Sequence, residues 1–158
     1  MKFNSLETLA AATISAMVFI GANAIAGHAQ TSKNGNSIVG TWQTAVTPRN
    51  CATGLPLAPP FAGILTFNQG GTMTGTSTAV TSTYGIWSTE PGQREYSFTT
   101  ISQRFTPTGM LLGTRKIIQD VSVDGDSFTS NGVFVDADTS GTTVATGCST
   151  STGERLVQ

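Results

Sequence analysis

The residues of this chain that are able to do chemistry are few. Among its 158 residues there is one histidine, His28, and there are two cysteines. His28 falls in a segment that we expect to be removed, so the mature chain would contain no histidine. A serine-histidine-aspartate triad, a cysteine-histidine pair and a histidine-ligated zinc are then excluded. We therefore predict no catalytic residue, no metal site and no cofactor, and we expect a binding protein rather than an enzyme.

The two cysteines, Cys51 and Cys148, lie 97 positions apart. Neither belongs to a CxxC pair, and neither follows the apolar leader as a lipoprotein cysteine would. Two cysteines in an exported chain favour one disulfide, although two separate thiols are the alternative. A bridge closing so long a loop would stabilise the fold by about 4–5 kcal/mol in the chain-entropy model.

The amino terminus predicts export. No Lys, Arg, Asp or Glu occurs between Glu7 and Lys33, and the stretch ends in small residues. This pattern is typical of a secretory signal peptide, here residues 1–29 with cleavage near Ala26 or Ala29, followed by a polar leader over 30–36. A membrane anchor is the alternative, because the uncharged stretch is long enough to span a bilayer. We expect a secreted or periplasmic protein without an integral membrane span once the signal is cleaved.

Composition excludes other classes of protein. Charged residues make up only 11% of the chain and the net charge is −1. A highly charged disordered chain is therefore excluded, and no basic field exists to hold nucleic acid. We predict no nucleic-acid partner, and the sequence sets no oligomeric state.

The sequence predicts that residues 37–158 form one all-β domain. Any functional site of the mature chain is therefore expected on its strands or loops. Runs of strand-forming residues alternate with turn residues such as the Asp-Gly of VDGDSF, and no apolar period of helical length follows residue 36. The predicted strands are 37–48, 61–68, 72–80, 84–90, 94–105, 110–124, 127–136 and 142–157. Short connections predict consecutive antiparallel pairing, hence a single eight-stranded up-and-down β-barrel, with a two-sheet β-sandwich as the alternative. A closed barrel would bring Cys51 and Cys148 to one rim, since its first and last strands are neighbours.

Two local motifs resemble a known family. Gly40-Thr41-Trp42 near the start of the first strand and Arg155 in the last are similar to the lipocalin and wider calycin pattern. The resemblance implies that Trp42 packs under Arg155 and closes one barrel end, a structural role for Gly40, Trp42 and Arg155. The tripeptide also resembles the opening strand of the avidins, and the strand count more loosely resembles the barrel of allene oxide cyclase.

An eight-stranded barrel encloses packed side chains or one small ligand. The predicted pocket residues, which point inward on alternating positions, are Phe67, Tyr84, Trp87, Tyr96, Phe98, Arg115 and Phe134. The alternative is that the aromatic residues simply form the core. Arg115 would bind a ligand carboxylate if it shared the inward face of Ile117; otherwise it joins the other charges of its strands in exposed cross-strand pairs.

Three functions follow from these observations. The first hypothesis is a lipocalin-like barrel that binds a small apolar molecule in its interior. The second is a cofactor-free isomerase or cyclase of the allene oxide cyclase type, which would need one buried acid. The third is a filled barrel that acts as an envelope or surface interaction module.

Overall fold

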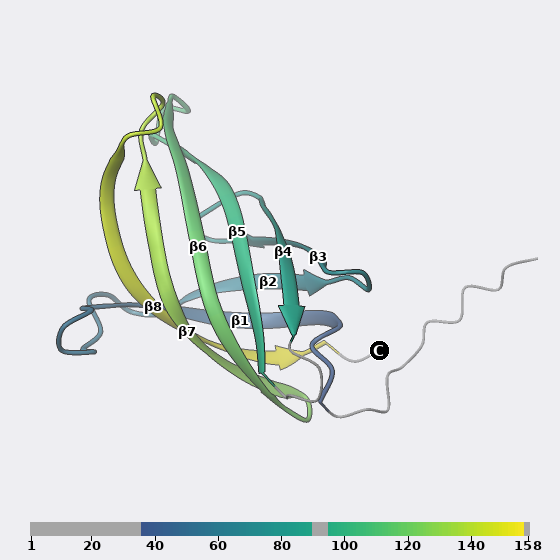
Figure 1. The fold of residues 1–158 in the computed structure, drawn as a ribbon. Coiled ribbons are helices and arrows are strands. Elements are labelled where there is room, and N and C mark those ends of the chain that lie inside the picture. Colours follow the sequence, from purple (N-terminus) through teal and green to yellow (C-terminus); the bar gives the residue numbers. More distant parts are fainter. Residues whose placement is uncertain (1–35, 90–94, 157–158) are drawn as a thin grey trace, which may run out of the picture. The chain divides into compact units, whose positions relative to one another are not determined.

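The fold is a closed barrel of eight antiparallel strands in sequence order (Figure 1). The computed structural model describes residues 36–89 and 95–156. The predicted signal peptide and all but the last residue of the polar leader lie outside this part. The strands are β1 Gly40–Arg49, β2 Phe61–Phe67, β3 Thr72–Ser77, β4 Thr83–Thr89, β5 Glu95–Phe105, β6 Leu111–Asp124, β7 Ser127–Ala137 and β8 Thr143–Arg155.

The predicted fold class is confirmed, and the sandwich alternative is wrong. The barrel closes because β1 pairs with β8 from Trp42 opposite Arg155 to Arg49 opposite Cys148. A sandwich would leave these two strands as separate edges. The predicted disulfide between Cys51 and Cys148 is also confirmed, with the Cα atoms 5.2 Å apart. The bridge joins the loop after β1 to β8, beside the line of pairing that closes the barrel.

The strands differ in length, and this shapes the two ends of the barrel. β5 to β8 have 11, 14, 11 and 13 residues, whereas β2 to β4 have six or seven. In Figure 1 the longer strands rise above β2, β3 and β4 and end in two neighbouring hairpins. One end of the barrel is therefore compact, and the other has a high wall on one side only.

The apolar core fills the compact end. Eight residues form it: Ile38, Trp42, Phe67, Met73, Phe98, Val121, Val123 and Phe128. Phe67 lies in edge-to-face contact with Trp87, Phe98 and Phe128, at centroid distances of 5.7 to 6.5 Å. Such contacts add about 0.5–1.5 kcal/mol per pair beyond simple burial.

Glycines on β8 make room for two of the interior rings. Phe128 of β7 pairs with Gly153 of β8 in the strand register, and Phe134 pairs with Gly147. The ring of each phenylalanine lies over the glycine with which it pairs. A Cβ added at Gly153 or Gly147 would come within 2.1 or 2.4 Å of the facing ring. These positions of a Thr- and Ser-rich strand therefore need glycine for packing, and any side chain there would push the ring out of place.

The turn between β7 and β8 is held by Asp138. Its carboxylate accepts hydrogen bonds from the hydroxyl of Ser140 (2.6 Å) and from the backbone N–H groups of Ser140 and Thr142 (2.9 and 3.0 Å). These bonds, that from the Ser140 side chain foremost, favour the charged form and lower the pKa of Asp138 below 3.8.

We therefore expect the pKa of the Asp138 carboxyl in the folded protein to lie below its ordinary value. A lowered folded-state pKa means that its contribution to stability is complete above the unfolded-state pKa of about 3.9 and is lost as the pH falls through the folded value. An NMR titration of the side-chain carboxyl carbon measures the midpoint. Asp138→Asn should remove this part of the acid sensitivity, and a midpoint at or above 3.9 in the wild type would contradict the assignment.

Candidate functional site

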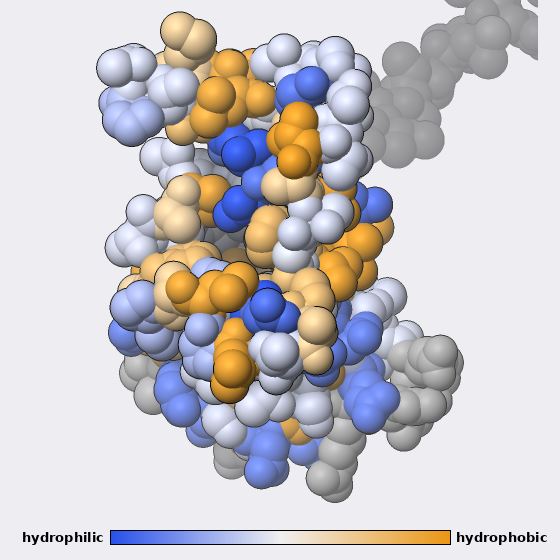
Figure 2. All heavy atoms as spheres, turned by 90° about the vertical axis from the view of Figure 1, so that its left-hand side faces the viewer, coloured by the Kyte–Doolittle hydropathy of each residue, from blue (hydrophilic) through white to orange (hydrophobic). Residues whose placement is uncertain are grey.

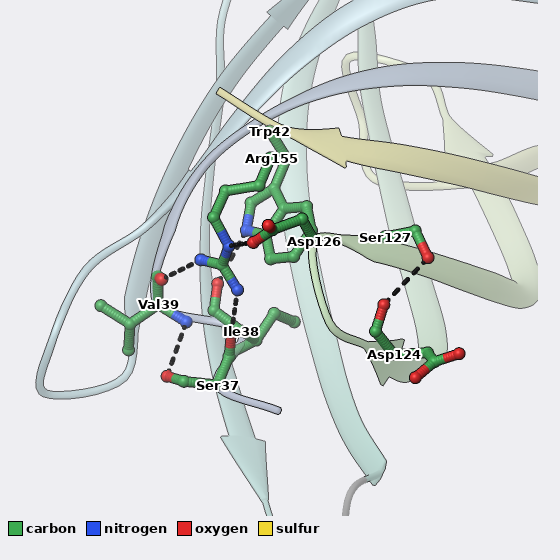
Figure 3. A network of polar contacts seen from close by, with 8 residues as sticks. All are labelled: Ser37, Ile38, Val39, Trp42, Asp124, Asp126, Ser127 and Arg155. Carbon is green, nitrogen blue, oxygen red and sulfur yellow. Dashed lines mark hydrogen bonds and ion pairs between the residues drawn. The ribbon is translucent and has the colours of Figure 1, made fainter. Parts of the chain in front are cut away.

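Arg155 and Trp42 close the compact end of the barrel. The guanidinium carbon of Arg155 lies 4.1 Å from the centroid of the Trp42 ring, and Trp42 is fully buried. Arg155 also donates a hydrogen bond to the exposed carboxylate of Asp126 at 2.9 Å (Figure 3). This is the arrangement that the calycin resemblance implied, and it places a cation–π contact across the barrel end.

The segment before β1 runs beneath this pair and is fixed by side-chain donors. Arg155 donates to the carbonyl oxygens of Ser37 (2.6 Å) and Val39 (2.7 Å), and Trp42 Nε1 donates to that of Ile38 (2.8 Å), as Figure 3 shows. The hydroxyl of Tyr96 donates to the carbonyl of Asn36 at 2.6 Å. The compact end, as far as the described residues form it, is thus sealed by hydrogen-bonded backbone.

Several predicted pocket residues belong to this sealed half. Phe67 and Phe98 are buried in the core, while Trp87 and Tyr96 are half-buried and contact each other edge to face at 5.9 Å. Trp87 Nε1 donates to the carbonyls of Asn68 and Thr72, at 2.9 and 3.1 Å. Of these four residues, only Phe98 also lines the interior cavity described below.

Tyr84 does not face the interior, so that expectation is wrong. Its side chain is 66% exposed and lies on the outside of β4. The residues of β4 that face inward are Thr83, which is buried, and the half-buried Gly85 and Trp87. Tyr84 and Trp87 are three positions apart and therefore lie on opposite faces of the strand.

A buried polar network crosses the middle of the barrel. Gln119 of β6 donates from Nε2 to Ser149 Oγ at 2.9 Å, and its Oε1 accepts hydrogen bonds from Ser130 and from Ser151 (3.0 Å). Ser130 and Ser151 also contact each other at 2.9 Å. Sequence reasoning missed this network, although its members occupy inward positions of β6, β7 and β8. Serines at alternate positions of a strand are typical of a solvent-exposed face, and only the register of the barrel shows that these serines point inward.

Above the network, three charged side chains meet at the open end. Arg115 binds Asp136 with two hydrogen bonds, from Nε at 2.7 Å and from Nη2 at 2.9 Å. Arg115 Nε binds Oδ1 and its Nη2 binds Oδ2, and Arg104 Nε lies 3.3 Å from the same Oδ2. Asp136 is almost fully buried, and each arginine side chain keeps about a quarter of its surface exposed. We call Arg104, Arg115 and Asp136 the rim cluster; two cations and one anion leave it with a net charge of +1.

The rim cluster meets the condition set for Arg115. Exposed cross-strand pairs were the alternative for Arg115, yet Arg115 shares the inward face of Ile117 and Arg104 of β5 turns to the same end of the barrel. Its guanidinium also lies 4.5 Å from the ring centroid of Phe134, another predicted pocket residue. No sequence motif marks Asp136, because its partners are 21 and 32 positions away.

One buried polar atom beside the rim cluster has no hydrogen-bond partner within the described part of the chain. It is the hydroxyl oxygen of Ser102, whose residue is 3% exposed. Ser102 pairs directly with Arg115 in the β5–β6 register and with Thr83 in the β4–β5 register. A buried hydroxyl without a partner costs about 1–3 kcal/mol, so this position favours an incoming hydrogen-bonding group.

Two adjoining hollows lie at the open end. An interior cavity of about 70 Å³ is bounded by apolar side chains, including Val46, Phe61, Leu65, Phe98 and Ile117, and also by Gln119 and Arg115. A larger notch of about 380 Å³ lies where β5 continues past the end of β4, next to residues 77–81. The two share Ser77, Ala79, Val80 and Arg115, so we call the notch the portal. In Figure 2 one side of the protein is hollowed, with hydrophilic residues set between hydrophobic ones.

Other kinds of site find no support in the described residues. Within 36–89 and 95–156, no three His, Cys, Asp or Glu side chains gather closely enough to hold a metal ion. In the same ranges, no helix is long and apolar enough to cross a membrane.

The fold and the sealed end together define an eight-stranded up-and-down barrel that is consistent with a calycin-like fold. No family model, no curated protein and no solved structure matches the chain. The function is therefore argued from the geometry of the open end.

Proposed function

We propose that this protein binds a small amphiphilic molecule at the open end of the barrel. The apolar part of the ligand enters the interior cavity, and its anionic head lies in the portal against Arg104 and Arg115. The observation that carries the proposal is the lining shared by the two hollows. The adjoining hollows thereby set an apolar wall on one side of Arg115 and the cationic groups of the rim cluster on the other.

The size of each hollow sets the shape of the ligand. A cavity of about 70 Å³ equals little more than the liquid volume of two water molecules at about 30 Å³ each. It accepts a short apolar group, and the portal, at about 380 Å³, takes the larger part of the molecule. The interior cavity therefore holds only a small part of the ligand, because the aromatic residues fill the compact end.

The charge of the rim cluster favours an anion. Arg104 and Arg115 share a single carboxylate, which leaves guanidinium N–H groups able to bind another one. The unpartnered hydroxyl of Ser102 lies across the β5–β6 pair from Arg115, although Ser102 lines neither hollow. A carboxylate or a similar anion with two or more oxygens matches this set of donors.

The isomerase hypothesis receives no comparable support. It needs a buried carboxylate free to accept a proton, and the buried carboxylate of Asp136 is held by two guanidinium groups. Both oxygens of Asp136 already bind guanidinium groups, so its geometry suits orienting the arginines better than contacting a substrate.

The test uses sodium hexanoate and 1-hexanol as probes, which share an apolar chain and differ in the head group. In two-dimensional NMR spectra of the mature protein, hexanoate should shift the amide signals of Val80, Arg115 and Ile117. Arg104→Met should weaken hexanoate binding at least tenfold, the loss of about 1.4 kcal/mol that one charge-assisted hydrogen bond can supply.

Lys116→Met is the matched control. Lys116 follows Arg115 on the same strand but points outward, so hexanoate affinity should stay at the wild-type value. If hexanol bound with the same affinity as hexanoate, the result would still support an apolar binding site in the cavity, but it would contradict the proposed binding of an anionic head by Arg104 and Arg115. Absence of shifts at the portal with both probes would overturn the proposal.

A further inference from the structure

The outer face of β4 to β7 carries a row of four side chains, three of them apolar and one a threonine. The strand register places Ile86, Thr99, Ile118 and Val133 side by side across the four strands. Ile86 is 66% exposed, Val133 43% and Ile118 39%. Tyr84 and Ile101 form an exposed pair in the row alongside. We call the set Ile86, Thr99, Ile118 and Val133 the apolar row.

Such a surface is unusual for a lone molecule. Single exposed apolar residues are common on soluble proteins, but contiguous patches of several hundred Å² mark interaction sites. The side chains here come from four adjacent strands, so they form one patch and not scattered residues. A partner that covers the row would remove this apolar surface from water.

The charges next to the apolar row are arranged symmetrically about it. Along β6, the outward positions are Lys116, Ile118 and Asp120 in order, so a cation lies on one side of the row and an anion on the other. The ion pairs of the described residues involve Arg104, Arg115 and Arg155 and leave Lys116 and Asp120 unpaired. The two charges lie about 13 Å apart along the strand, too far to pair within one chain.

We propose that the apolar row is the interface for a second copy of this chain. The two copies are related by a two-fold axis that runs along the row, perpendicular to the strands. The strands of the second copy then run in the opposite direction to those of the first. Each residue of the row then meets its own counterpart, Ile118 against Ile118 and Val133 against Val133. Lys116 of each copy meets Asp120 of the other, which gives two ion pairs.

The charges also select this axis over its alternative. A two-fold axis parallel to the strands would place Lys116 against Lys116 and Asp120 against Asp120, and both contacts would repel. An unlike partner would need no such self-complementary order of cation, apolar residue and anion on one strand. The arrangement therefore favours a homodimer over a different protein.

The area of the face sets the strength of the dimer. Four strands over the seven residues from 115 to 121, centred on Ile118, cover about 440 Å² at the usual strand spacing. A standard stable interface covers about 800 Å² on each partner. The dimer should therefore be weak and reversible, and should form at protein concentrations of about 10–500 µM.

Sedimentation equilibrium of the mature protein over that concentration range tests the proposal. The wild type should show a monomer–dimer equilibrium, whereas Lys116→Glu and Asp120→Lys should each weaken association at least tenfold, because each introduces two like-charge contacts. The double variant K116E/D120K restores opposite charges across the axis and should dimerise about as well as the wild type. An equimolar mixture of the two single variants should form a heterodimer for the same reason.

Asp124→Lys is the control for a change of charge on the same face of β6. Asp124 lies two outward positions beyond Asp120, away from the apolar row, so its substitution should leave the equilibrium constant within twofold of the wild type. Far-ultraviolet circular dichroism verifies that each variant is folded. A wild type that stays monomeric at 500 µM, or a double variant no better than the single ones, would overturn the proposal. Neither Lys116 nor Asp120 contacts the interior cavity or the portal, so this result is independent of ligand binding.

Discussion

Replacing Cys51 and Cys148 together by serine should lower the free energy of unfolding by about 4–5 kcal/mol. The bridge closes a loop across 97 positions, and in the chain-entropy model a loop of that length restricts the unfolded chain by this amount. This loss is a large fraction of the 5–15 kcal/mol that stabilises a typical domain. The native contacts around the bridge change little, because Cys51 lies in an exposed turn.

Urea unfolding of the wild type and the double variant, followed by circular dichroism, measures the difference. The wild type treated with a thiol reductant is the control, and its unfolding free energy should fall by a similar amount. A loss below about 1 kcal/mol in both would mean that the unfolded chain is hardly restricted by the bridge, contrary to the entropic account.

Trp42→Ala should be nearly as damaging, with a loss of about 3–5 kcal/mol, the usual range for removal of a large buried aromatic side chain. Trp42 is fully buried and its ring lies 5.1 Å from that of Phe128. The variant also removes the hydrogen bond to the Ile38 carbonyl and the ring beneath Arg155. The guanidinium would then face a cavity in place of an aromatic surface.

Trp87→Ala serves as the matched comparison, since Trp87 lies at the same end of the barrel and also donates from its indole N–H to backbone carbonyls. Its side chain is only half-buried and carries no guanidinium above it, so the loss should be smaller by at least 1 kcal/mol. Urea midpoints of the two variants decide the comparison. An equal loss would show that the Trp42–Arg155 contact adds nothing to ordinary burial.

Most of the fold could be predicted because its signals are local. The strand boundaries differ from the predicted ones by only a few residues, since turn residues such as those of VDGDSF mark the ends of each strand. The pairing of Cys51 with Cys148 was favoured by their number together with the predicted export, and the closed barrel explains why they meet. Short connections left little choice but neighbouring antiparallel strands.

The open end could not be predicted in the same way. Which face of a strand points inward depends on the register, and a shift of one residue exchanges the two faces. Tyr84 was therefore placed inside, and Ser130 and Ser151, which are buried, were passed over as ordinary polar residues. The rim cluster joins three strands through side chains far apart in sequence, and nothing local identifies Asp136 as the partner of Arg104 and Arg115.

The pairing of β1 with β8 has a consequence for how this chain folds. The other seven strand pairs join consecutive segments, whereas this one brings together residues about 100 positions apart. Contacts so distant in sequence form slowly, so closure is expected to be the last and rate-limiting step. Until then, β1 and β8 are open edges that can pair with other chains and aggregate. Oxidation of Cys51 and Cys148 after closure would slow the separation of β1 from β8, because the disulfide links the loop after β1 to β8 covalently.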